Sequence, residues 1–426
     1  MNIKKKYVMK VSKLMMIVLS VIVLMACKRE GCTDQNADNY DKNAKNDDGS
    51  CVYNGVNPND PNNPGGGTTG PGGQELPIRL SGKETSNLVI EDISSDPNVV
   101  EYYIDDNWRI AADVVIEPGV RIEMRQDAYI LVESNGSLDA TGTPNDKIQI
   151  LGGDDVKGHW KYIKYESNET NNKLIHCNIA HGGGAWNAQG MVTVQGSANL
   201  TVQNSSFTMG KEYGLFVSHR EGKLPDFKDN YFDAFEKQPI SLHTFGQSGT
   251  LDNTTTFGSN NDMNDIRVHG DNYSNSVNVP KLNLPYYLAN VFEITGGHTS
   301  FSPGVTLIMG QDTRIIASDQ GSLSLDGTVT DSVRVYGASG IPGYWQSIVL
   351  ESMKTENEFS YTTFNYGGGA WNNDAMIYIR GGALAMNNCY IKNGSKKALN
   401  KDNNGVFNDN GGNMHSDCQE GGGLLP

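Results

Sequence analysis

The chain has 426 residues, enough for one large domain or several smaller ones. It contains 49 glycines, only 19% charged residues and a formal net charge of −15 at pH 7. The glycine content exceeds the usual share of about 7% and favours short strands and tight turns over long helices. The acidic balance argues against a nucleic-acid partner, because an acidic surface repels the phosphate backbone.

Residues 1–26 have the pattern of an export signal. A basic stretch precedes an apolar run, residues 14–26, which is shorter than the roughly 20 residues of a membrane span. The run ends in Leu-Met-Ala-Cys at Cys27, which resembles the lipobox of bacterial lipoproteins. The resemblance implies cleavage before Cys27, lipidation of its thiol, and a membrane-anchored outer-membrane lipoprotein of a Gram-negative bacterium, facing the periplasm or the cell surface. An ordinary secretory signal with a chance cysteine is the alternative.

Residues 27–53 hold a polar module between Cys32 and Cys51, which in an exported protein are most simply a disulfide. The segment resembles a Cys-bounded repeat of bacterial surface proteins, which starts Gly-Cys-Thr-Asp and ends Asp-Asp-Gly-Ser-Cys. Two interpretations of its oxygen-bearing side chains stay open: a Ca²⁺ site, or a solvated polar loop. An EF-hand loop is not completed, because Asn39 and Lys45 stand where glycine and a bidentate glutamate are needed. The candidate Ca²⁺ ligands are Asp34, Asn36, Asp38, Asp41, Asp47 and Asp48.

Residues 54–75 are rich in Gly, Pro and Asn and predict a tether. Residues 65–70 match the Gly-x-Gly-x-x-Gly fingerprint of dinucleotide-binding proteins, but no strand precedes them and no helix follows, so we reject that match. A tether of this length spans roughly 25 Å as a coil and about 70 Å when extended.

The rest of the chain, residues 76–426, contains a duplicated unit. The sequence His-Gly-Gly-Gly-Ala-Trp at 181–186 returns as Tyr-Gly-Gly-Gly-Ala-Trp at 366–371, a spacing of 185 residues. Gly-His-Trp at 158–160 and Gly-Tyr-Trp at 343–345 keep the same spacing, so the unit was duplicated with almost no insertions.

Apolar residues in this part alternate at period 2, as at residues 120–124, which predicts short strands with one buried face. A β-sandwich and a solenoid both fit such strands. The Gly-x-Leu-x-x-x-Gly-Thr cassette at 136–143, the Gly-x-Trp cassettes and the asparagine corners resemble the right-handed parallel β-helix repeat family. The corners are Asn204, Asn230 and Asn388. The resemblance implies an all-β solenoid with three short strands per coil and roughly fourteen coils.

The repeat halves are predicted at about residues 100–285 and 286–426. The polar stretch 240–300 departs from the pattern and predicts irregular coils with long turns that join the halves. Cys177 lies between apolar alternating residues, which indicates a buried small side chain. Cys389 and Cys418 could pair across neighbouring coils or stay free.

The β-helix resemblance also raises polysaccharide lyases and glycosidases, so an enzyme must be considered. Of the polygalacturonase-like motifs only Asp-Asp occurs, at 105–106 and 154–155. The second pair has no counterpart in the other half, where Ser339-Gly340 stands, and is either a turn or a weak candidate site. No metalloprotease, Cys-x-x-Cys, nucleophile-elbow or Walker motif is present in the sequence.

The duplicated aromatic residues are the candidate ligand-binding side chains. Exposed aromatic rings on a β-helix flank can stack on sugar faces, but each tryptophan could instead protect the edge of the core. The candidates are Trp160, Trp186, Trp345, Trp371, His181 and Tyr366. The favoured function is a non-catalytic binding or adhesion protein for glycans or another surface. A carbohydrate-active enzyme and a structural spacer are the alternatives, and no cofactor beyond Ca²⁺ is implied.

Overall fold

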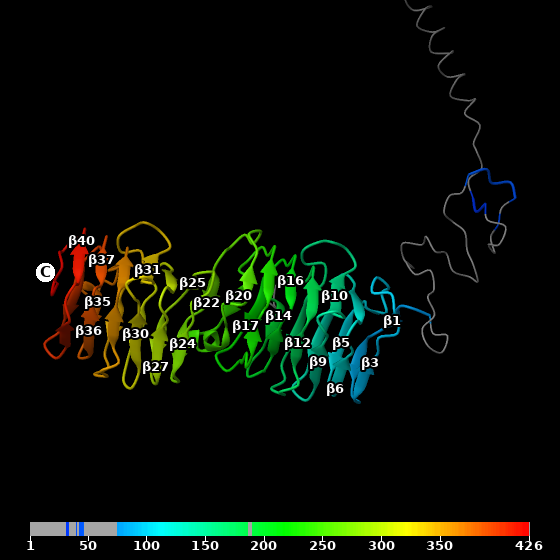
Figure 1. The fold of residues 1–426 in the computed structure, drawn as a ribbon, viewed down its shortest axis with the longest axis horizontal. Coiled ribbons are helices and arrows are strands. Elements are labelled where there is room, and N and C mark those ends of the chain that lie inside the picture. The colour runs from blue at the N-terminus through cyan, green and yellow to red at the C-terminus, as the bar shows by residue number, and fades with distance from the viewer. Residues whose placement is uncertain (1–30, 34–39, 41, 47–74, 186–189, 426) are drawn as a thin grey trace, which may run out of the picture. The chain divides into compact units, whose positions relative to one another are not determined.

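The computed structural model describes residues 31–33, 40, 42–46, 75–185 and 190–425. The chain divides into two compact units, Met1–Leu76 and Pro77–Pro426. The second unit is a nearly all-β parallel solenoid of about 13 turns (Figure 1), which confirms the predicted fold class. Among the described residues the one helix is the 3-10 helix η1 (Phe245–Thr250), and no helix is long and apolar enough to cross a membrane.

The strands form five parallel sheets, in which each strand pairs with the strands before and after it in the order that follows. Sheet 1 joins β1 (Ile78–Arg79), β4 (Tyr102–Ile104), β7 (Arg121–Met124), β10 (Ile148–Gly152), β13 (Cys177–Ala180), β16 (Ser206–Thr208), β19 (Tyr231–Asp233) and β21 (Thr256–Phe257). Sheet 2 joins β2 (Gly82–Glu84), β5 (Asn107–Ile110), β8 (Tyr129–Val132), β11 (Tyr162–Tyr165), β14 (Gly190–Val194), β17 (Tyr213–Val217), β20 (Ile240–Leu242), β22 (Ile266–Val268), β25 (Tyr286–Leu288), β28 (Thr306–Met309), β31 (Val333–Gly337), β34 (Thr362–Asn365), β37 (Tyr390–Lys392) and β40 (Met414–Ser416).

The other three sheets are shorter and belong to one half of the stack each. Sheet 3 joins β3 (Leu88–Ile90), β6 (Asp113–Ile116), β9 (Ser137–Thr141), β12 (Lys173–Ile175), β15 (Thr201–Gln203) and β18 (Phe227–Lys228). Sheet 4 joins β23 (Asp271–Tyr273), β26 (Phe292–Ile294), β29 (Ile315–Ala317), β32 (Ile348–Leu350), β35 (Ala375–Ile379) and β38 (Lys397–Lys401). Sheet 5 joins β24 (Val277–Val279), β27 (His298–Phe301), β30 (Ser322–Asp326), β33 (Glu358–Ser360), β36 (Ala383–Asn387) and β39 (Val406–Asp409).

Alternation along each strand creates the core. In β7, Ile122 and Met124 are fully buried, whereas Arg121 and Glu123 face outward. Because every strand is parallel to the one above it, inward side chains of one coil stack on those of the next, as Ile122 does on Ile150. One continuous apolar column therefore fills the solenoid from the first coils to the last.

Left-handed backbone turns end many of the strands, as the asparagine corners predict. Asn204 and Asn388 have φ angles of 51° and 50°. The prediction is wrong at Asn230, because the preceding Asp229 takes the left-handed angle, at 55°. Asn230 is instead buried and bonds the neighbouring coil, accepting from the Ser205 backbone N–H at 3.1 Å.

Each strand of the second copy lies one sheet further along the coil than the equivalent strand of the first copy. The 185-residue spacing relates β7 in sheet 1 to β28 in sheet 2, and β9 in sheet 3 to β30 in sheet 5. In Figure 1 the labelled strands of sheet 2 climb from the middle of the view at β14 to its upper edge at β40. The turns after β10 and β31 consequently both project from that upper edge, although they leave different sheets (Figure 1).

The join between the copies is more regular than predicted. Strands β22 to β27 continue the stack within residues 240–300, and the departure from the pattern is η1, which follows β20. Thr244 and Gln247 form a capping box that starts this helix. Phe245 packs inward with its ring centroid 5.0 Å from that of Phe292. A helical turn thus replaces a strand where sheet 3 ends, and sheet 1 ends one strand later at β21.

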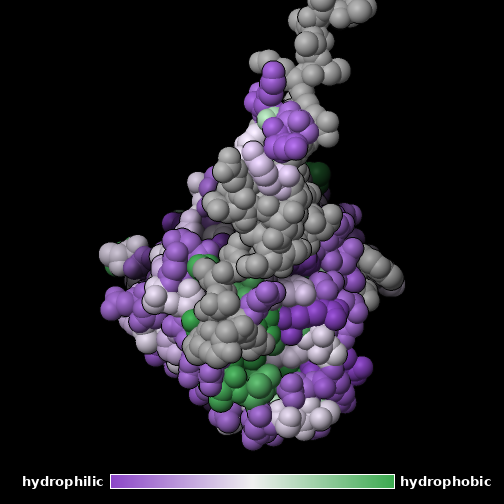
Figure 2. Space-filling view, turned by 90° about the vertical axis from the view of Figure 1, so that its right-hand side faces the viewer, coloured by the Kyte–Doolittle hydropathy of each residue, from purple (hydrophilic) through white to green (hydrophobic). Residues whose placement is uncertain are grey.

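The two ends of the solenoid differ. At the C-terminal end Leu425 is buried against the core. At the other end Val89 and Val115 pair side by side on the outer face of sheet 3 and are 51% and 42% exposed. Figure 2 looks at this first-coil end and shows an apolar area within a mostly hydrophilic surface.

The cysteines of the described solenoid are free, so the suggested pairing of Cys389 with Cys418 is wrong. Cys177 is buried, as the alternation indicates, and burial raises its pKa to about 12. Cys32 is disulfide-bonded, but Cys51 lies outside the described residues, so their pairing stays a prediction.

Candidate functional site

Two of the predicted ligand-binding tryptophans belong to the core. Trp160 and Trp345 have no exposed surface, and each indole N–H donates to a backbone carbonyl, of Ala180 at 2.7 Å and of Asn365 at 2.8 Å. A ring without an exposed face cannot stack on a ligand, so the binding interpretation is wrong for these two residues. They serve the architecture, which was the alternative interpretation of the tryptophans.

The triple glycine shapes the turn around each buried tryptophan. A Cβ on Gly367 would lie 2.5 Å from the Trp345 ring, and one on Gly369 would lie 2.1 Å from the Gly343 carbonyl oxygen. Gly368 has a φ of +91°, which side-chain-bearing residues rarely adopt. The first copy repeats this arrangement, since a Cβ on Gly182 would meet the Trp160 ring at 2.5 Å. Each glycine is therefore needed for the geometry of the turn.

Trp371 follows the glycine turn around Trp345 and is 90% exposed. The ammonium group of Lys396 donates to the backbone carbonyls of Ala370 and Asn373, on either side of the tryptophan. The Asn373 side chain is itself buried and donates to the Ser347 hydroxyl at 3.0 Å. Trp371 is thus an exposed ring on a turn whose backbone is fixed. Its counterpart Trp186 lies outside the described residues, so its binding role stays a prediction.

His181 and Tyr366 occupy equivalent left-handed positions, with φ angles of 71° and 64°. His181 lies 3.5 Å from the Asp155 carboxylate, and burial lowers the pKa of its imidazole. His159 lies at the same distance from Asp154.

The ionisable groups of this corner are specific to the first copy. The second copy has the same turns, but its residues at the equivalent positions are Ser339, Gly340, Tyr344 and Tyr366. The fold does not require these charges.

The candidate Ca²⁺ ligands cannot be placed. Asp34, Asn36, Asp38, Asp41, Asp47 and Asp48 all lie outside the described residues. Within the described part of the chain, no group of three or more His, Cys, Asp or Glu side chains is arranged to hold a metal ion.

A cleft that the sequence does not reveal lies at the join between the copies. Two adjoining cavities of about 300 Å³ each share Arg220, Glu221, Tyr273 and Asn275 as lining residues. Three stretches build this junction cleft: residues 220–225 after β17, η1 after β20, and residues 272–275 of β23 and the turn that follows it. The cleft exists because η1 does not continue the sheet that would otherwise fill this side of the stack.

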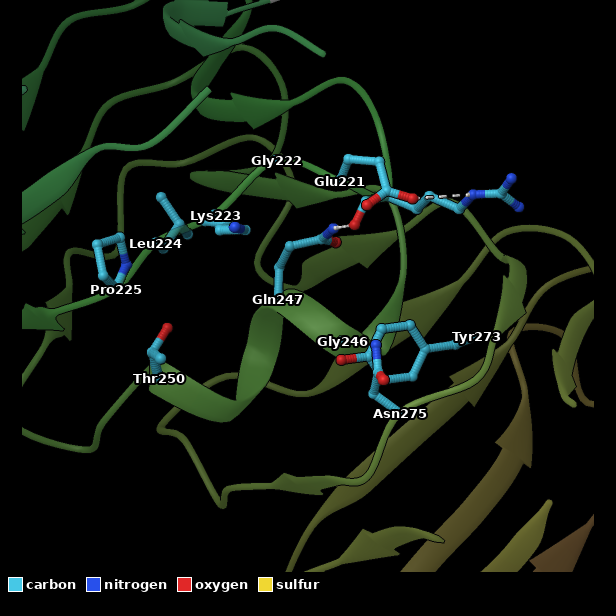
Figure 3. Close-up of a pocket in the computed structure, with 11 residues that line it drawn as sticks. Glu221, Gly222, Lys223, Leu224, Pro225, Gly246, Gln247, Thr250, Tyr273 and Asn275 are labelled. Atoms are coloured by element: carbon cyan, nitrogen blue, oxygen red, sulfur yellow. Dashed lines mark hydrogen bonds and ion pairs between the residues drawn. The ribbon is translucent and has the colours of Figure 1, made fainter. Parts of the chain in front are cut away.

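The walls of the junction cleft combine an aromatic ring with planar polar groups (Figure 3). Tyr273 packs against Gly246, where an added Cβ would lie 2.2 Å from the ring. In Figure 3, Tyr273 and Asn275 lie on one side of Gln247, and Leu224 and Pro225 lie on the other.

Hydrogen bonds fix Gln247 at the centre of the cleft. Its amide group donates to the Arg220 carbonyl at 2.9 Å, and its side-chain oxygen accepts from the Thr244 backbone N–H at 2.8 Å. The polar centre of the cleft is therefore rigid.

The charges around the junction cleft balance. The Arg220 guanidinium lies 3.6 Å from the Glu221 carboxylate and 3.7 Å from that of Asp271, and it also donates to the Asn272 side chain. Lys223 adds a second positive charge to the lining. Arg220, Lys223 and Glu221 line the cleft, and Asp271 beside Arg220 borders it, so these four groups together carry no net charge that would select a charged ligand.

A column of three stacked histidines borders the cleft. The ring centroids of His219 and His243 are 5.7 Å apart, and those of His243 and His269 are 5.5 Å apart. Asp271 lies 3.1 Å from His243, and burial together with repulsion from His243 lowers the pKa of His269. In the sequence these histidines look scattered. The signal that could have found them is their spacing, since each one follows a strand of sheet 2 in consecutive coils.

Comparison with protein-family models, with curated proteins and with solved structures gives no match to this chain.

Proposed function

We propose that this protein is an exported, lipid-anchored solenoid that binds a neutral glycan without cleaving it. The observation that carries the proposal is the junction cleft, in which the Tyr273 ring lies beside the fixed amide of Gln247 and the amide of Asn275. Sugars present an apolar ring face together with hydroxyl groups, which suits an aromatic wall beside planar hydrogen-bonding groups. The charges of the lining are balanced once the bordering Asp271 is included, which favours a neutral sugar over a uronate.

Binding without hydrolysis is favoured by the carboxylates of the cleft. Glycoside hydrolysis commonly uses two carboxyl groups that face each other across the scissile bond. Glu221 is the one carboxylate among the described lining residues, and it pairs with Arg220. The described lining thus offers recognition groups and one carboxylate, and the neighbouring Asp271 is paired with His243 and Arg220.

Replacing Tyr273 by alanine is expected to weaken glycan binding about tenfold, because the stacking surface is lost. Isothermal titration with a neutral glycan selected on an array measures the change. Tyr231→Ala is the matched control, since Tyr231 is an exposed tyrosine (39%) on sheet 1, away from the cleft. Equal affinities of the two variants would contradict the proposed cleft, and an array without any neutral-glycan signal would contradict the proposed function.

The lipid anchor rests on the lipobox at Cys27 and has its own test. Globomycin blocks removal of lipoprotein signal peptides, so the precursor is expected to accumulate in treated cells. Immunoblotting of membrane fractions detects the larger form, and Cys27→Ser is the control that should escape lipidation. Unchanged processing of the natural sequence under globomycin would refute the anchor and leave glycan binding untouched.

A further inference from the structure

The junction cleft and Trp371 lie on the same border of sheet 2. The chain leaves sheet 2 after β17, β20 and β22, and the segments that follow these strands line the cleft. The Trp371 turn likewise follows a strand of sheet 2, β34, on the way to β35 in sheet 4. We call this side, at which the chain leaves sheet 2, the exit border.

The one-sheet offset between the copies places Trp371 on this border. In the first copy the corresponding turn lies between β13 in sheet 1 and β14 in sheet 2, so it belongs to the opposite border, where the chain enters sheet 2. In the second copy the turn has moved round by one sheet and follows β34. The two duplicated turns therefore lie on different borders of sheet 2, whereas the junction cleft and Trp371 share one border.

Four ladder steps separate the junction cleft from Trp371, through the pairs β22–β25, β25–β28, β28–β31 and β31–β34. At about 4.8 Å for each step the separation along the stack is about 19 Å. A monosaccharide is too short to touch both places, but a linear oligosaccharide can reach from one to the other.

The exit border between the two places is polar and exposed. Asn290 follows β25, and Gln311 and Asp312 follow β28, all three exposed to solvent. These side chains can donate to or accept from sugar hydroxyls along the way.

The turn after β31 is fixed to the Trp371 turn. The Gly343 N–H donates to the Gly367 carbonyl at 3.1 Å, and the Tyr344 N–H donates to the Tyr366 carbonyl at 2.9 Å. Trp371 is thus held at the far end of the border before any ligand arrives, which reduces the ordering that binding requires.

We propose that the ligand is a linear neutral glycan that lies along the exit border, with one portion in the junction cleft and a later unit stacked on Trp371. This inference rests on the proposed function and adds the ligand's length and direction to it. The cleft supplies the polar recognition, and Trp371 supplies a second stacking contact that only a long chain can use.

A length series of neutral oligosaccharides tests the inference by isothermal titration. The probes are cellobiose and cellohexaose, with the matching pairs of malto- and xylo-oligosaccharides. In the series that binds, the long member is expected to bind about tenfold more tightly than the short one. Trp371→Ala should remove this advantage and leave the short member unaffected, whereas Tyr273→Ala should weaken both.

Met353→Ala is the matched control, because Met353 is an exposed apolar residue (56%) that follows β32 in sheet 4, away from the exit border. Equal affinities for short and long members, or a long member unaffected by Trp371→Ala, would overturn the inference and leave the proposed function standing. Absence of binding in all three series would overturn the proposed function and the inference together.

Discussion

Trp345→Ala is expected to lower the free energy of unfolding by about 4 kcal/mol, the usual cost of removing a large buried aromatic side chain. The ring is fully buried, touches the Gly367 backbone closely, and donates its indole N–H to the Asn365 carbonyl at 2.8 Å. The substitution leaves a cavity and an unpaired carbonyl at the same place. Urea unfolding followed by circular dichroism measures the loss, and hydrogen exchange should localise it to the coils of β31 and β34.

Trp371→Ala provides the comparison for this result. It removes the same residue type from a position that is 90% exposed, so its cost should stay within about 0.5 kcal/mol. Trp160→Ala in the first copy should match Trp345→Ala, because Trp160 is equally buried and equally bonded. If Trp345→Ala and Trp371→Ala cost the same, the assignment of one tryptophan to the core and the other to the surface is refuted.

Asn357→Ala should cost about 3 kcal/mol, because two buried backbone groups lose their partners. The Asn357 side chain accepts from the Leu323 N–H at 2.9 Å and donates to the Ser352 carbonyl at 2.8 Å. It thereby connects two neighbouring coils at a place where the strands do not supply the bond. The change is measured as the shift of the urea midpoint at constant slope.

The first copy offers an independent repeat of this experiment. Asn172 accepts from the Leu138 N–H and donates to the Ser167 carbonyl, each at 3.1 Å, so Asn172→Ala should have a similar cost. Asn372→Ala is the control, because Asn372 is exposed. A cost for Asn357→Ala no greater than that of the control would show that the coil-to-coil bonds contribute little to stability.

The fold could be predicted because its physical rules are local. Period-2 alternation determines which face of each strand is buried, and left-handed angles at Asn204 and Asn388 mark the corners. The fixed spacing of 185 residues revealed the duplication. The burial of Trp160 and Trp345 was harder to predict, since only the contact with a glycine of the next coil distinguishes these rings from Trp371.

The candidate site brings together residues that are far apart in the chain, and their meeting could not be predicted from the sequence. The junction cleft joins Arg220, Gln247 and Tyr273 from three consecutive coils, and none of them belongs to a recognisable motif. Their meeting follows from η1, which interrupts the strand pattern after β20. The spacing of 185 residues likewise shows which residues of the two copies are equivalent, but it does not show in which sheet each of them lies. That depends on how many strands the chain forms between the copies.

The continuity of sheet 2 across the join determines how a solenoid of this kind can be lengthened by gene duplication or insertion. Where β20 stacks on β22, sheet 3 has ended and sheets 4 and 5 have yet to begin, so among the described strands two ladders cross the step, β20–β22 of sheet 2 and β19–β21 of sheet 1. The equivalent strands β7 and β28 lie in different sheets, so the two copies are not separated by a whole number of coils. A gene segment inserted into this scaffold therefore needs strands that continue two of the ladders, and not a complete matching coil, to be accommodated.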